Sequence, residues 1–268
     1  MTDPIAFRFG PLEIRWYGIF AALAFLVGYS FVKFRARTRK FTPELIDRLL
    51  FWVLIGGVTG ARFMYVVTHF SEFRGRWFET LMVWQGGLVF YGGFIGAFMA
   101  AYVVASLQNM DKRALADLLA PALPLGHAVG RIGCFLNGCC FGEPYHGPLA
   151  VEYPPNSAVN FVQKELGHLP VAAQECLPVF PVQLLASATN LLIFAILLLI
   201  EPRLKAKGQL LALYAMLYSV TRFLTEFMRG DYLQKFGGLT SAQILCLIIL
   251  PTGLAAYYAL GRKIRAKD

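Results

Sequence analysis

Three arginines lie where the sequence is otherwise apolar enough for the interior of a membrane. Arg131 follows an apolar run that begins near Leu115, Arg62 lies in an earlier run, and Arg222 shares a later one with Glu226. A guanidinium group is costly inside a bilayer unless it has a partner or a function. Arg222 and Glu226 are four residues apart on one helical face, so an ion pair that serves only packing is the alternative reading for them. One carboxylate cannot neutralise three arginines.

The chemistry that suits these arginines is the binding of an anion. Guanidinium groups bind phosphate through charge-assisted hydrogen bonds. The abundant anion in a bilayer is the phosphate of a phospholipid. The residues alone therefore predict a phospholipid-handling site that opens outward, and they leave the reaction unspecified.

The composition determines which elements must position these residues. The chain is 57% hydrophobic and 15% charged over 268 residues, more apolar and less charged than soluble domains. We predict an all-α, polytopic membrane protein that forms one integral domain over residues 1–268, with seven spans of about 20 residues, the length that crosses a bilayer. The expected spans are Trp16–Phe34, Ile46–Thr68, Gly86–Leu107, Leu115–Leu136, Gln183–Ile200, Gln209–Met228 and Ser241–Leu260.

The basic residues predict the orientation. The segments on one side of the expected spans carry fourteen Lys and Arg residues, and the segments on the opposite side carry six. Because cytoplasmic loops are enriched in Lys and Arg, the N-terminus is expected outside and the C-terminus in the cytoplasm. The net charge of +9 thus needs no nucleic-acid partner. The long outer segment 138–181 holds seven of the fourteen prolines, which predicts a small external head.

Several glycines recur at helical spacing, among them Gly56 with Gly60, Gly92 with Gly96, and Gly126 with Gly130. Small residues at this spacing let helices approach closely inside a membrane. We therefore expect close helix packing at these positions.

Six segments carry a resemblance to a known family. They are RWYG (15–18), GAR (60–62), WQGGLVFYGG (84–93), GRIGCFLNGCCFG (130–142), FPVQLL (180–185) and YSVTRFLTEFMRGD (218–231). Together, in this order and at compatible spacing, they resemble the bacterial prolipoprotein diacylglyceryl transferases over essentially the whole chain. Each segment is weak evidence by itself, whereas all six in order are specific.

The resemblance implies transfer of the diacylglyceryl group from phosphatidylglycerol to the lipobox cysteine in the signal-peptide region of a prolipoprotein. A thioether forms and glycerol phosphate leaves, in a bacterial cytoplasmic (inner) membrane. Such a reaction needs cations to stabilise the leaving phosphate and a group that removes the thiol proton, since the thiolate is the nucleophile. The implied partners are phosphatidylglycerol, the prolipoprotein and membrane lipid. No cofactor or metal is implied.

The resemblance also implies roles for individual residues. Arg131 is similar to the family's phosphatidylglycerol-binding arginine and Arg222 to a second essential arginine, and both are expected to be catalytic. The other expected phospholipid-binding residues are Tyr17, Arg62, Gly92, Gly93, Asn137, Gly142, Tyr218 and Glu226. Tyr17 and Tyr218 also fit the aromatic belt at a membrane interface, and Gly142 also fits a turn.

The proton acceptor is left open by the sequence. Tyr91 stands where the best-known members have a histidine that is the favoured general base. A tyrosine has an ordinary pKa near 10, so it acts as a base only if cations stabilise its phenolate, and we expect Tyr91 to orient substrate by hydrogen bonding. His127 is one helical turn before Arg131 and is a second candidate. The substrate's own phosphate is a third.

The cysteines depart from the family pattern as well. Cys134 and Cys139 replace an amide and a carboxylate present in some members. The Cys-x4-Cys-Cys spacing is not a usual structural-zinc pattern, so no metal is predicted. Cys139, Cys140 and Cys176 lie near or in the external segment, where a disulfide is possible. Cys134 and Cys246 are expected to be apolar packing residues.

A phospholipid- or anion-handling membrane transporter is the alternative function. Such transporters also hold intramembrane arginines, but they commonly have inverted repeats or broken helices in both halves. The sequence has no recognisable repeat of this kind. A metal-dependent phospholipid enzyme would need carboxylates inside the spans, where Glu226 is nearly alone.

Overall fold

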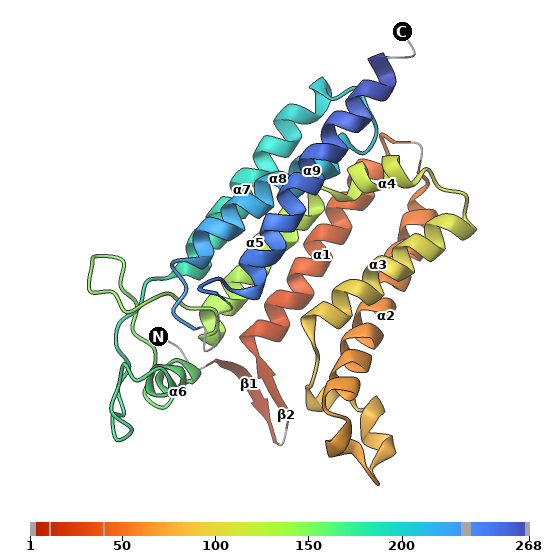
Figure 1. Cartoon of the computed structure of the whole chain (residues 1–268). Coiled ribbons are helices and arrows are strands. Elements are labelled where there is room, and N and C mark those ends of the chain that lie inside the picture. The colour runs from red at the N-terminus through yellow and green to blue at the C-terminus, as the bar shows by residue number, and fades with distance from the viewer. Residues whose placement is uncertain (1–3, 11, 40, 232–236, 266–268) are drawn as a thin grey trace. The chain divides into compact units, whose positions relative to one another are not determined.

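The chain divides into two compact units, each described here by itself. The computed structural model describes residues 4–10, 12–39, 41–231 and 237–265 (Figure 1). The smaller unit comprises residues 31–115, and the larger unit comprises the residues before and after that segment. Lys40, Lys235 and Lys267, which contribute to the charge bias, lie outside the described residues.

Helices dominate both units, which confirms the all-α membrane fold. They are α1 (Trp16–Ala36), α2 (Pro43–Thr68), α3 (Phe90–Leu107), α4 (Lys112–Leu119), α5 (Ala122–Asn137), α6 (Ala158–Glu165), α7 (Val182–Ile200), α8 (Gln209–Glu226) and α9 (Ser241–Arg265). Six segments in the described part of the chain are long and apolar enough to cross a membrane: α1, α2, α3, α4 with α5, α7 and α9. Helix α8, the remaining expected span, has 18 residues but is not among them, because its polar side chains lower its mean hydropathy.

The smaller unit is built on the pairing of α2 with α3. A Cβ added at Gly60 or Gly92 would clash with the backbone of the opposite helix, and the same holds for Gly56 and Gly96. The close approach predicted from these glycines is therefore confirmed. Three short 3-10 turns, η1 (Phe70–Phe73), η2 (Trp77–Leu81) and η3 (Val83–Gln85), connect the two helices.

The larger unit is a bundle in which α5, α7, α8 and α9 run side by side (Figure 1). Gly126 of α5 lies against the backbone of Ala24 in α1, as expected from its small size, whereas Gly130 faces open space. The expected span Leu115–Leu136 is two helices, because the segment breaks at Pro121. Proline has no amide hydrogen and fits the first turn of a helix but not its interior.

A small head joins α5 to α7 within the larger unit. Residues 138–181 carry α6 and have a core of their own formed by Phe141, Tyr153, Val159 and Val179. Figure 1 shows the head at the same end of this unit as the hairpin of β1 (Ile5–Phe9) and β2 (Leu12–Arg15). This hairpin is not among the elements predicted from the sequence. The helix ends that carry the arginines of α5 and α8 are thus on the head side.

Candidate functional site

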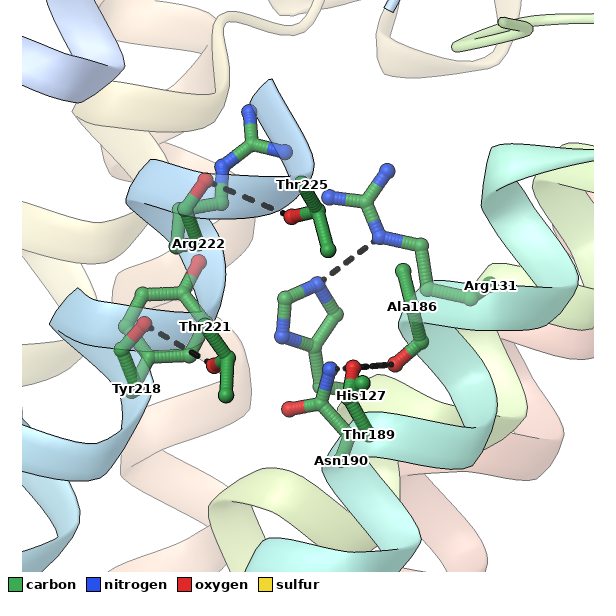
Figure 2. Close-up of a pocket in the computed structure, with 9 residues that line it drawn as sticks. All are labelled: His127, Arg131, Ala186, Thr189, Asn190, Tyr218, Thr221, Arg222 and Thr225. Carbon is green, nitrogen blue, oxygen red and sulfur yellow. Dashed lines mark hydrogen bonds between the residues drawn. The ribbon is translucent and has the colours of Figure 1, made fainter. Parts of the chain in front are cut away.

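A cavity inside the larger unit brings together side chains from α5, α7 and α8 (Figure 2). It is lined by His127, Arg131, Ala186, Thr189, Asn190, Tyr218, Thr221, Arg222 and Thr225. Its volume is about 210 Å³, including the part open at its mouth. Because its lining is mostly polar, this cavity suits a polar group and not the acyl chains of a lipid.

Arg131 comes to the cavity from α5, six residues before that helix ends, or about 9 Å along its axis. Its Nε donates a hydrogen bond of 3.0 Å to Nε2 of His127, so the shared helical face expected for the two residues is confirmed. The terminal Nη atoms of Arg131 have no hydrogen-bond or ion-pair partner among the described residues. Figure 2 shows this guanidinium and that of Arg222 on the same side of the cavity.

The hydrogen bond fixes how His127 takes part. Since Nε2 accepts from Arg131, the proton of a neutral imidazole must be on Nδ1. The centre of its ring lies 5.5 Å from that of Tyr218, which also lines the cavity. His127 is therefore placed to orient Arg131, and it could accept a proton at Nε2 only if that hydrogen bond broke.

Arg222 comes from α8 and is paired with Glu226. Its Nη2 lies 2.8 Å from Oε2 of Glu226, which is 2% exposed. The hydroxyl of Thr240 donates a hydrogen bond of 2.8 Å to Oε1 of Glu226, and Nη1 of Arg229 lies 3.7 Å from Oε2. The ion pair predicted from the four-residue spacing is confirmed. Glu226 thus holds arginines in place.

The local charge balance stays positive. Arg229 binds Asp231 through two hydrogen bonds of 2.9 and 2.7 Å. Arg131, Arg222 and Arg229 therefore face two carboxylates, those of Glu226 and Asp231, within the described part of this cluster. The net charge of +1 favours an anion at the cavity.

Gly142 ties together the ends of the helices that form the site. Its amide donates to the carbonyl of Phe180 before α7, at 3.0 Å, and Glu143 N donates to the carbonyl of Met228 after α8, at 3.1 Å. A Cβ on Gly142 would lie 2.5 Å from the Phe180 oxygen and 3.0 Å from the Met228 oxygen. Gly142 is thus a position of close backbone approach, and its backbone has no positive φ that a turn glycine would provide.

Arg62 is positioned differently, in the smaller unit. Its Nε donates to the carbonyl of Thr80 at 2.9 Å and its Nη1 to that of Gly86 at 2.7 Å, while Nη2 donates to the carbonyl of Glu79. The side chain also lies over the ring of Tyr65. These bonds hold the connection between α2 and α3, and a lipid phosphate would have to compete with them. Phospholipid binding by Arg62 stays a prediction.

Three further candidates, Tyr91, Gly92 and Gly93, begin α3 in the smaller unit. Tyr91 is 48% exposed and its ring meets that of Phe90 edge-on. Gly92 and Gly93 face α2: a Cβ at Gly92 would clash with the backbone of Gly60, and one at Gly93 would make a tight contact of 3.2 Å with the carbonyl of Gly57. The packing role of the two glycines is clear from these contacts, and the expected roles of all three residues in the reaction stay predictions.

Two candidates in the larger unit, Tyr17 and Asn137, are not among the residues that line the cavity. Tyr17 is half exposed near the start of α1, and its backbone lies next to Gly133 of α5. Asn137 is the last residue of α5, and its buried Oδ1 has no hydrogen-bond partner in the described part of the chain. Lipid contacts of both remain predicted. Thr189 and Asn190, which line the cavity, were not predicted from the sequence, although two adjacent polar residues within the apolar run of α7 were a signal.

Comparison with known proteins identifies the family. The family model described as prolipoprotein diacylglyceryl transferase matches residues 4–259. The chain belongs to this family. A phosphatidylglycerol–prolipoprotein diacylglyceryl transferase of Nostoc sp. is 35% identical over 263 residues, which cover 94% of this chain and 87% of the relative. Relatives of the same name from Staphylococcus saprophyticus (30% identical; 94% and 87% covered) and Thermotoga maritima (31%; 95% and 83%) are similarly related.

This prolipoprotein diacylglyceryl transferase family member has several apolar helices of membrane-spanning length and is a multi-pass membrane protein. Its residues Arg131 and Arg222 were each expected at the site from the sequence, and the fold brings both to one cavity. His127 and Tyr218 lie in the same cavity.

Proposed function

We propose that this protein transfers the diacylglyceryl group of phosphatidylglycerol to the cysteine thiol of a prolipoprotein lipobox, the first step of lipoprotein maturation. The sulfur attacks the glycerol carbon that carries the phosphate, and a carbon–sulfur bond forms while the carbon–oxygen bond breaks. The thiol proton goes to an acceptor, and glycerol phosphate leaves with the bonding electron pair. The products are a thioether and glycerol phosphate.

The observation that carries this proposal is the convergence of two guanidinium groups on one small cavity. Arg131 offers its two Nη groups, and Arg222 approaches from the opposite helix while Glu226 anchors it. Negative charge develops on the phosphate as the carbon–oxygen bond breaks, so donors already oriented toward it lower the barrier. In this proposal both arginines bind the lipid phosphate and stabilise its departure.

The remaining residues act around this centre. In this proposal Tyr218, which lines the cavity, contacts the lipid headgroup together with Asn137 and Tyr17, and Gly142 keeps the helix ends together. Tyr91 is proposed to orient the substrate by a hydrogen bond. Because Nε2 of His127 is engaged by Arg131, we favour proton removal by Tyr91 or by the substrate's phosphate over removal by His127.

The proposed setting is a bacterial cytoplasmic membrane, with the N-terminus outside and the C-terminus in the cytoplasm. The charge bias of the loops supports this orientation. It places the head on the outer side, where a translocated precursor presents its signal peptide. No nucleic acid takes part.

The test is a transfer assay with the purified protein. The protein is incubated in detergent with phosphatidylglycerol and a peptide that contains a lipobox, and the peptide is analysed by mass spectrometry. We expect the mass of one diacylglyceryl group on the cysteine, and no addition to a peptide with serine in its place. A folded protein that modifies none of several lipobox peptides would sink the proposal.

A further inference from the structure

Three cysteines meet where α5 ends, outside the cavity. Cys134 lies in the last turn of the helix, and Cys139 and Cys140 lie in the turn that follows. Their Sγ atoms are all within 4.8 Å of one another, and all three thiols are free. None of the three lines the cavity. We call them the thiol cluster.

Backbone conformation and hydrogen bonds hold the turn that carries the thiol cluster. The chain reverses through left-handed residues at Gly138 (φ 71°) and Cys140 (φ 58°), and such a conformation is uncommon for a residue with a side chain. The amide of Cys139 donates to the carbonyl of Cys134 at 3.1 Å. Gln183 of α7 donates to the carbonyl of Cys139 at 2.9 Å. A site whose backbone is fixed in this way is preorganised for a ligand.

We propose that the thiol cluster is a binding site for one thiophilic metal ion, Cu(I) or Zn²⁺, held by three thiolates. A zinc–sulfur bond measures about 2.3 Å, so two sulfurs on one ion are at most about 4.6 Å apart. The thiol cluster is already close to that size. Thiolates select soft metals over Mg²⁺ and Ca²⁺. The spacing of the cysteines in the sequence does not indicate a metal site, whereas their positions in the folded turn do.

The thiol cluster offers three sulfur ligands. Metal binding would release the thiol protons. No fourth cysteine, histidine or carboxylate joins the cluster among the described residues. Since closed zinc sites use four protein ligands, we expect Cu(I) to bind more tightly than Zn²⁺.

The test titrates the full-length protein, reduced and kept without oxygen in detergent. Cu(I) is supplied in competition with a chromogenic Cu(I) chelator, Zn²⁺ is titrated in parallel, and bound metal is counted after gel filtration. We expect one ion per chain for at least one of the two metals. Replacing a cluster cysteine by serine should weaken binding at least tenfold, whereas the control variants should bind like wild type. The cluster variants are Cys134→Ser, Cys139→Ser and Cys140→Ser, and the controls are Cys176→Ser and Cys246→Ser.

A second measurement uses the wild-type chain and needs no variant to fold. Alkylation by N-ethylmaleimide, read by mass spectrometry, should be slowed by bound metal at the three cluster thiols and unchanged at Cys176. The proposal is overturned if neither metal binds the reduced protein, if metal protects no cluster thiol, or if the serine variants bind as well as wild type. A disulfide within the cluster of the protein as isolated would also overturn it.

Discussion

Replacing Arg222 separates its role in the reaction from its role in the fold. Arg222→Gln leaves the buried carboxylate of Glu226 with Arg229 at 3.7 Å and the hydroxyl of Thr240. Removing one partner of a buried ion pair costs about 3–5 kcal/mol. At about 2–4 °C per kcal/mol for a chain of this size, the unfolding midpoint should fall by roughly 10 °C.

The double variant Arg222→Gln with Glu226→Gln removes both charges of the ion pair, so no buried carboxylate is left without its arginine. Most of the lost stability should return in this variant. Its transfer rate should nevertheless stay about 100- to 1,000-fold below wild type, because a single oriented donor to developing charge is worth that much. Stability is read by thermal unfolding in detergent and the rate by mass spectrometry of the lipobox peptide.

Two outcomes would refute this reasoning. If the double variant recovers near wild-type transfer together with its stability, Arg222 serves only the fold and leaves the mechanism. If Arg222→Gln alone unfolds at the wild-type temperature, the carboxylate of Glu226 does not depend on this pair.

Further predictions concern the centre and its supports. Arg131→Gln should slow transfer about 100-fold or more with an unfolding midpoint close to wild type, since the one hydrogen bond of its side chain among the described residues is to a histidine. Tyr91→Phe should lower the transfer rate, because the phenol is proposed to orient substrate by a hydrogen bond. Full activity of this variant would remove Tyr91 both from that role and from proton removal. Gly142→Ala should destabilise the protein by about 1–3 kcal/mol because its Cβ has no room, whereas Gly130→Ala faces open space and should be tolerated in thermal unfolding. Burial raises the pKa of Tyr153 above its ordinary value in the folded protein. The stability that its neutral phenol contributes is therefore present below about pH 10, the pKa of an unfolded tyrosine, and is lost as the pH rises through the pKa of the folded state. Tyr153→Phe should not show this loss of stability at alkaline pH.

The membrane fold could be predicted because each span is a local property of the sequence. About 20 apolar residues in a row form a helix that begins and ends within a few residues of the expected bounds, as α7 and α9 do. The break at Pro121 follows from the chemistry of proline, but the continuous apolar run around it predicted a single span. The hairpin of β1 and β2 is short, and its alternating residues gave too weak a pattern beside the span that follows.

The candidate site was predictable only in part. The pair of Arg222 and Glu226 and the contact of His127 with Arg131 follow from four-residue spacing on one helix. The partners of Arg62 lie 17 to 25 residues away in an irregular connection, so no local pattern could indicate them. The gathering of the three cluster cysteines likewise depends on left-handed backbone after α5.

The central claim is that Arg131 and Arg222 together bind the phosphate of phosphatidylglycerol. The most direct measurement is an experimental structure of the protein with a phosphonate analogue of this lipid in place of the reactive ester. Our account predicts the phosphorus atom in the cavity, with oxygens within hydrogen-bond distance of both guanidinium groups. A phosphonate bound elsewhere, with both arginines making only the contacts they make within the protein, would contradict it.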